Sequence, residues 1–103
     1  MASDISSPPD FLAHREGDNV AVAVRDLAPG PVEGGYLHGP RSHRLELVSE
    51  VPLGHKFALT DIPEGERVIE YGVHTAVATA AIAPGEYVHV HNVRSARWQH
   101  RTA

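Results

Sequence analysis

The sequence contains no cysteine. This absence excludes disulfide bonds, thiolate zinc sites and iron–sulfur clusters ligated by this chain. No apolar run approaches the roughly 20 residues of a membrane-spanning helix. The basic start and apolar stretch of a secretory signal peptide are also missing. We therefore expect a cytoplasmic protein without a membrane partner.

An excess of positive charge is also lacking. Lysine and arginine total 9 against 13 acidic residues, which gives a formal net charge of -4, and the arginines are dispersed along the chain. A protein that binds nucleic acid usually carries a concentrated basic surface, because it must neutralise phosphates. Nucleic acid is therefore not an expected partner.

Aromatic residues make up only 6% of the chain, whereas hydrophobic residues make up 42%, many of them alanine and valine. A chain of 103 residues fits one small domain. Its core is expected to be small and rich in β-branched side chains. No apolar pattern of helical period is long enough to predict a helix, so the sequence indicates a mainly β fold.

The expected elements follow from local patterns. Apolar residues run without interruption over residues 20–24 and end in turn chemistry, which predicts a strand. The glycine-dense segment 34–40 predicts a hairpin loop or irregular excursion. Residues 1–13, with serines and a proline pair, are expected to form a flexible tail. Further strands are expected over residues 45–51, 57–59, 68–69, 77–80 and 87–90.

A short pattern occurs three times, in residues 24–30, 59–65 and 79–85. In each case an aliphatic residue precedes a glycine by two or three positions. The aliphatic side chain is expected to anchor a turn in the core, and the glycine to adopt a positive φ. Asp26 and Asp61 are expected to bond turn amides. The uneven spacing excludes a solenoid and predicts a pseudo-symmetric fold with tight corners.

Histidine is over-represented, with eight residues in this short chain. His89 and His91 are two positions apart on an expected strand, so their side chains should project from the same face. They could bind one metal ion, although such sites need at least three ligands. The alternative is a polar strand face, or histidines bonded to the backbone.

His55 and Lys56 follow Gly54, where the backbone is expected to bend. Lys56 could bind a carboxylate or sulfonate, and His55 could carry a proton near neutral pH. The alternative is a solvated lysine beside a histidine that closes a turn, since adjacent strand residues point to opposite faces. Asn92 could donate to a substrate oxygen or close a turn.

Several segments together resemble a known family. Residues 54–62, 68–72 and 83–92 are similar to the N-terminal domain of altronate dehydratases, and more distantly to that of galactarate dehydratase. Residues 18–23, preceded by His14, also resemble the altronate enzymes. In size the chain is closer to the small subunit of two-subunit members such as sulfolactate sulfo-lyase. Two departures are the lack of the usual glycine and aspartate in residues 73–81, and a His-x-His-Asn string that galactarate dehydratase lacks.

The resemblance implies a SAF-type β-clip domain over residues 14–98, followed by a C-terminal tail at 99–103. It also implies a lyase that eliminates water or sulfite from a hydroxy acid. The chain would then be a small subunit, inactive alone, that completes the active site of a large catalytic subunit supplying the base. The expected cofactor is a divalent metal shared with that subunit, Fe2+ with Mn2+ as the alternative.

The resemblance further suggests roles for particular residues. These are catalysis by His55 and Lys56, substrate contacts from Lys56, Asn92 and His14, and metal binding by His89 and His91. Two alternatives stay open. One is a non-catalytic module that binds a carbohydrate or sugar acid or serves assembly. The other is a structural domain that forms homo-oligomers through its edge strands.

Overall fold

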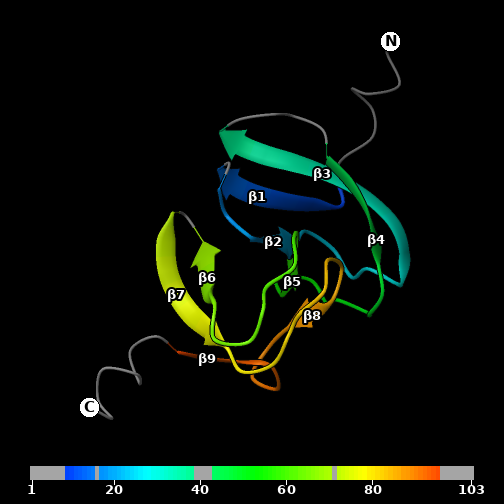
Figure 1. Cartoon of the computed structure of the whole chain (residues 1–103). Coiled ribbons are helices and arrows are strands. Elements are labelled where there is room, and N and C mark those ends of the chain that lie inside the picture. The colour runs from blue at the N-terminus through cyan, green and yellow to red at the C-terminus, as the bar shows by residue number, and fades with distance from the viewer. Residues whose placement is uncertain (1–8, 16, 39–42, 71, 96–103) are drawn as a thin grey trace, which may run out of the picture.

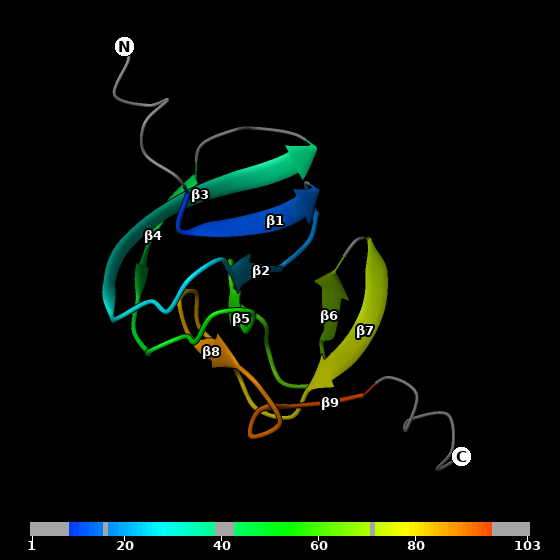
Figure 2. The same ribbon diagram turned by 180° about the vertical axis from the view of Figure 1, so that it is seen from behind.

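The computed structural model describes residues 9–15, 17–38, 43–70 and 72–95. These residues form a six-stranded sheet of order β4-β3-β1-β2-β5-β8 and a three-stranded sheet of order β6-β7-β9 (Figures 1 and 2). The strands are β1 Phe11–Arg15, β2 Val20–Ala23, β3 Gly30–His38, β4 His43–Leu47, β5 Lys56–Ala58, β6 Arg67–Glu70, β7 Val73–Ala78, β8 Tyr87–Val88 and β9 Val93–Ser95. The predicted mainly β fold is confirmed. Among the described residues there is no helix with the length and hydropathy needed to cross a membrane.

Strand β1 corrects the predicted boundary of the N-terminal tail. It pairs antiparallel with β2 and parallel with β3, and its Phe11 is fully buried. The prediction of a flexible tail up to residue 13 is therefore wrong for Phe11 to Ala13. The preceding residues are polar and gave no sign of a strand, because β1 is stabilised by its pairing with β2 and β3. Residues 1–8 lie outside the described residues, as does the tail predicted at 99–103.

The glycine-dense segment is also a strand rather than a loop. Gly34 and Gly35 of β3 pair with Phe11 and Leu12 of β1. A Cβ atom at Gly34 would overlap the carbonyl oxygen and the ring of Phe11. Glycine therefore serves here to let two strands approach closely, and the predicted loop over residues 34–40 is wrong up to His38, where β3 ends. Residues 39 and 40 are not described.

Three other predicted boundaries change. The strand expected over 45–51 is β4, which ends at Leu47. Strand β7 begins at Val73, four residues before the expected start. The strand expected over 87–90 ends at Val88, and a further strand, β9, follows a turn. The strands predicted over 20–24, 57–59 and 68–69 are confirmed within one residue at each end.

The repeated corners are confirmed in their aliphatic residues and glycines, and Asp26 accepts a hydrogen bond from the Leu53 amide at 2.8 Å. Leu27, Ile62 and Ile82 are buried, and the glycine that follows each has a positive φ, of 134°, 87° and 86° respectively. A fourth corner, at residues 51–54, was not predicted from the sequence as part of this repeat. The corners pair through isolated bridges, Leu27 with Val51 and Ile62 with Ile82. The four corners thus form two bridged pairs.

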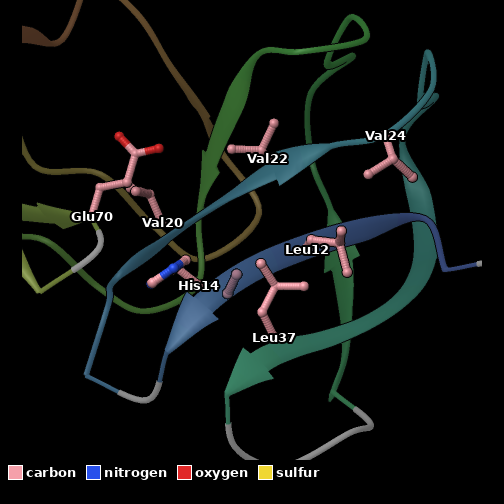
Figure 3. Close-up of a pocket in the computed structure, with 8 residues that line it drawn as sticks. Leu12, His14, Val20, Val22, Val24, Leu37 and Glu70 are labelled. Atoms are coloured by element: carbon pink, nitrogen blue, oxygen red, sulfur yellow. The ribbon is translucent and has the colours of Figure 1, made fainter.

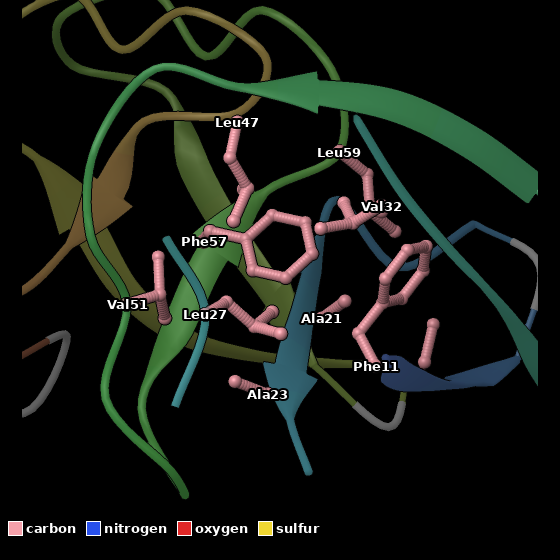
Figure 4. Packing of buried hydrophobic residues seen from close by; sticks show 10 residues of the cluster. Phe11, Ala21, Ala23, Leu27, Val32, Leu47, Val51, Phe57 and Leu59 are labelled. Carbon is pink, nitrogen blue, oxygen red and sulfur yellow. The ribbon is translucent and has the colours of Figure 1, made fainter. Parts of the chain in front are cut away.

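The core has two parts that share strands β2 and β5. The first contains Phe11 and Phe57, whose rings meet edge to face at 5.1 Å between centroids (Figure 4). The second is wholly aliphatic and includes Val20 and Ala58. Because successive residues of a strand face opposite sides, β2 and β5 can contribute to both parts. These two strands therefore form the wall between the two parts of the core.

Candidate functional site

Strand β5 separates the two residues that the sequence placed together. In the β5–β8 pairing Phe57 lies opposite Tyr87 and Lys56 lies opposite Val88. His55 therefore falls on the Phe57 side and Lys56 on the other side, as alternation along a strand requires. The side-chain contacts agree: His55 meets Tyr87, whereas the Lys56 ammonium lies 3.5 Å from a Glu70 carboxylate oxygen. His55 and Lys56 belong to two different surfaces.

The corner at residues 51–54 fixes the position of His55. Gly54 takes a φ of 83°, which confirms the predicted bend. The Gly54 amide donates to the Ala23 carbonyl at 2.9 Å, and the Ala23 amide donates back to the His55 carbonyl at 2.9 Å. The His55 amide also donates to the Pro52 carbonyl at 3.0 Å. Both the backbone amide and the backbone carbonyl of His55 are therefore hydrogen-bonded.

Four rings gather beside this corner, those of His55, Tyr87, His89 and His91, and we call them the ring cluster. The His89 ring stacks on His55 and on Tyr87, with centroid distances of 5.4 and 5.3 Å. The His91 ring lies 5.9 Å from that of Tyr87. The Tyr87 hydroxyl and the His55 Nδ1 atom are hydrogen-bonded at 2.5 Å. Tyr87 thus touches every histidine of the cluster.

His89 and His91 lie in a turn, so the prediction that they share one face of a strand is wrong. Strand β8 ends at Val88, and the amides of Asn92 and Val93 both donate to the His89 carbonyl, at 2.9 and 3.1 Å. These two bonds close a turn between β8 and β9. Both histidine side chains are exposed on it.

Asn92 holds this turn together. It is only 5% exposed. Its side-chain amide donates to the Tyr87 carbonyl at 2.8 Å, and its side-chain oxygen accepts from the His89 amide at 3.0 Å. Of the two roles considered for Asn92, closing the turn is the one that these bonds support.

The histidines of the ring cluster do not make a metal site by themselves. Within the ranges that the structure describes, no three histidine, cysteine or acidic side chains are grouped so that they could hold a metal ion. A structural or catalytic metal needs at least three protein ligands in most sites. Among the described residues, His89 and His91 could therefore supply at most two ligands of a metal ion, and the rest would have to come from elsewhere.

The opposite side of β2 carries a small apolar pocket of about 200 Å³. It is bordered by strands β1, β2, β3 and β6, and we call it the β1–β2 pocket (Figure 3). Its lining residues are Leu12, Ala13, His14, Val20, Val22, Val24, Leu37 and Glu70. His14 is half-buried there, and Glu70 connects the pocket to Lys56 through the ion pair. The predicted residues thus divide, with His14 and Lys56 on this side and His55, His89 and His91 in the ring cluster.

Two residues at these surfaces were not identified from the sequence, Tyr87 and Glu70. Each becomes notable only through a partner distant in sequence, His55 for Tyr87 and Lys56 for Glu70. One signal was available for Tyr87: it lies two positions before His89, and on the strand expected over residues 87–90 this spacing would place both side chains on one face. The pairing register that brings His55 opposite them was not visible in the sequence.

Comparison with known proteins gives these surfaces a family context. Residues 9–96 match the family model described as the altronate/galactarate dehydratase SAF domain. The chain is 37% identical over 91 residues to the (2R)-sulfolactate sulfo-lyase subunit alpha of Chromohalobacter salexigens, an alignment that covers 86% of this chain and 97% of that protein. It is 46% identical over 78 residues to the altronate dehydratase of Escherichia coli, covering 76% of this chain and 15% of that enzyme.

A third relative is the galactarate dehydratase (L-threo-forming) of Escherichia coli, 35% identical over 79 residues and matched over 14% of its length. The chain therefore corresponds to nearly all of one relative and to a small part of two much longer ones. The family model covers most of the chain, and the all-strand fold agrees with it. On these grounds the chain belongs to the altronate/galactarate dehydratase SAF domain family.

Proposed function

We propose that this chain is the small subunit of a lyase that eliminates water or sulfite from a hydroxy acid, acting in the cytoplasm with a separate large catalytic subunit. The observation that carries the proposal is the match over 97% of a protein named as subunit alpha of a sulfo-lyase. In the Escherichia coli altronate dehydratase the matching stretch is only 15% of a single chain. In a two-chain enzyme, the parts that the altronate dehydratase holds in a single chain would be divided between two subunits.

The ring cluster is the surface we assign to this enzyme. His89 and His91 are exposed and His55 is half-buried, so a second subunit can close over imidazoles that are already positioned. Imidazole can donate or accept a proton near neutral pH, as the departure of a leaving group requires. We propose that His55 contacts an oxygen atom of the group that leaves the substrate, and that the partner subunit supplies the base.

The β1–β2 pocket fits a hydroxy acid less well. Most of its wall is aliphatic, from Leu12, Val22, Leu37 and their neighbours, and an acid rich in hydroxyl groups would lose hydrogen bonds to water there. Lys56 is also engaged by Glu70. We therefore place the substrate at the ring cluster, where neither Lys56 nor His14 contacts it directly. Asn92 contributes by closing the turn that carries His89 and His91.

A divalent metal, Fe2+ or Mn2+, belongs to the proposed complex only with ligands from the large subunit, because the described residues lack a third ligand for His89 and His91. When bound, such an ion would stabilise negative charge on the substrate carboxylate. His89 and His91 would contribute at most two of its ligands.

The test is reconstitution. The purified chain and its large subunit are mixed and assayed for elimination from sulfolactate, altronate and galactarate, with and without added Fe2+ or Mn2+. We expect activity only in the mixture. The H55Q variant should lower kcat by about 100-fold or more, the usual size of a lost acid–base group. The matched control is H74Q, which replaces a half-buried histidine of β7 and should leave kcat unchanged.

Two results would contradict the proposal. Activity that is the same without this chain would favour the alternative of a non-catalytic binding module. A larger loss from K56M or H14Q than from H55Q would move the substrate from the ring cluster to the β1–β2 pocket.

A further inference from the structure

We propose that Tyr87 is a positioning residue that holds the neutral His55 ring in the tautomer whose proton is on Nε2. The evidence is the 2.5 Å hydrogen bond between the Tyr87 hydroxyl and His55 Nδ1. A neutral imidazole carries its proton on one nitrogen only, and the bond made by one nitrogen decides the state of the other. Only the assignment of His55 to substrate rests on the proposed function; the tautomer does not.

The direction of this bond follows from the chemistry of the two groups. A phenolic hydroxyl keeps its proton at neutral pH, and the unprotonated nitrogen of imidazole is its natural acceptor. When Tyr87 donates, Nδ1 accepts and the ring proton must be on Nε2. The reverse arrangement would make the phenol oxygen the acceptor and leave its own proton to be satisfied elsewhere. Tyr87 has no second side-chain partner among the bonds of the described residues.

Tyr87 is well held for this task. Its residue pairs with Phe57 across β5 and β8, its ring packs against the first part of the core, and its carbonyl accepts from the Asn92 side chain at 2.8 Å. The backbone of the preceding corner is equally constrained, because Gly85 lies against the Glu46 carbonyl. The hydroxyl therefore meets His55 from a strand that cannot easily shift.

The His89 ring stacks on both residues that form this bond. It is close to parallel with both partners, at 18° to Tyr87 and 26° to His55. Stacking between rings is a favourable contact of its own, so His89 helps to hold both partners in the position in which they form the hydrogen bond. His89 thus supports the Tyr87–His55 pair without bonding to either residue.

The consequence is that the hydrogen-bond donor of the neutral His55 ring is a defined atom, Nε2. His55 Nε2 is not among the buried atoms that lack a partner, and no bond to it is found within the described residues. In the proposed tautomer Nε2 therefore presents an N–H group to an incoming oxygen acceptor. Carboxylate, hydroxyl and sulfonate oxygens all fit that requirement, and these are the groups of the hydroxy acids considered above.

The test is nitrogen-15 NMR of the histidine rings in the complete 103-residue chain, at a pH where the rings are neutral. Two-bond proton–nitrogen correlations distinguish the two tautomers of each ring. For His55 we expect the Nε2–H form to predominate. The Y87F variant should reduce the ratio of Nε2–H to Nδ1–H about two- to tenfold, the effect of losing one hydrogen bond. The matched control is Y36F, since Tyr36 packs against the same part of the core beside His43.

A predominant Nδ1–H form in the unaltered chain would overturn the inference without any variant, so the test does not depend on Y87F folding. An unchanged ratio in a folded Y87F protein would also overturn it. In the reconstituted enzyme Y87F should lower kcat several-fold while KM stays the same. A shifted tautomer with an unchanged kcat would refute the catalytic assignment of His55 and leave the tautomer standing.

Discussion

The two sides of β5 carry different chemistry, although His55 and Lys56 are neighbours in the chain. On the His55 side the side chains are rings held by close contacts and a short hydrogen bond. On the Lys56 side a single ion pair joins two residues at the edge of an apolar pocket. Adjacent polar residues on a strand are therefore better counted as two candidate sites than as one.

The two sides also differ in how they are supported. The ring cluster depends on two rigid turns, the corner that ends at Gly54 and the turn closed by Asn92. The Lys56–Glu70 pair depends on side chains that are 40% and 14% exposed. Changes near the ring cluster should therefore affect folding and geometry together, whereas changes at Lys56 should affect little beyond the pair itself.

The largest effect is expected at the corner before β8. Gly85 and Gly65 have almost the same φ, 86° and 87°, but a Cβ at Gly85 would overlap the Glu46 carbonyl, whereas one at Gly65 meets nothing within 4 Å. G65A should lower the free energy of unfolding by about 1–2 kcal/mol, the cost of a left-handed conformation. G85A should lower it by about 2–5 kcal/mol, because crowding against the backbone is added.

Urea unfolding of both variants measures this difference. Equal losses in G65A and G85A would show that the close approach at Glu46 adds nothing, and would remove one reason to regard the ring-cluster side as the more rigid.

The next effect is expected at Asn92. N92A removes two side-chain bonds to the turn, to the Tyr87 carbonyl and from the His89 amide. We expect a loss of about 1–3 kcal/mol in the free energy of unfolding, typical of buried backbone groups left unsatisfied. His89 and His91 should also show altered NMR shifts, while His43 on β4 serves as the distant reference. Unchanged shifts for His89 and His91 would mean that Asn92 does not hold the ring cluster in place.

The smallest effect is expected at Lys56. K56M removes a half-exposed ion pair and should change the free energy of unfolding by no more than about 0.5 kcal/mol, because solvent screens such pairs. Urea unfolding at low and high salt measures the change, and E70Q is the matched variant for the other partner. A loss as large as that of N92A would contradict the view that this side of β5 is loosely supported.

The sequence predicted those features that depend on local chemistry. The apolar run of β2 and the corner glycines could be identified because each residue type has a direct conformational meaning. Strand β1 could not be identified from the sequence, because the apolar run Phe11-Leu12 is short and follows polar residues. These residues become part of a strand only by pairing with β2 and β3. The same holds for Gly34, whose role is a close approach between two strands.

The candidate site shows the same limit. Histidines 55, 89 and 91 were selected from the sequence, and all three lie in the ring cluster. Their arrangement was not predictable, because it depends on the β5–β8 register and on a turn that begins one residue after β8 ends. Tyr87 was missed for that reason: a tyrosine on an expected strand has no distinguishing feature until its neighbour across the sheet is known.

The pairing of β5 has a consequence for how the protein is made. Strand β5 joins β2, encoded well before it, to β8, encoded well after it, and contacts so distant in the chain form slowly because long loops must close first. During synthesis His55 emerges long before Tyr87, His89 and Asn92. The ring cluster therefore cannot assemble on a nascent chain until residue 92 has left the ribosome, and truncated products will lack it however well their earlier strands have folded.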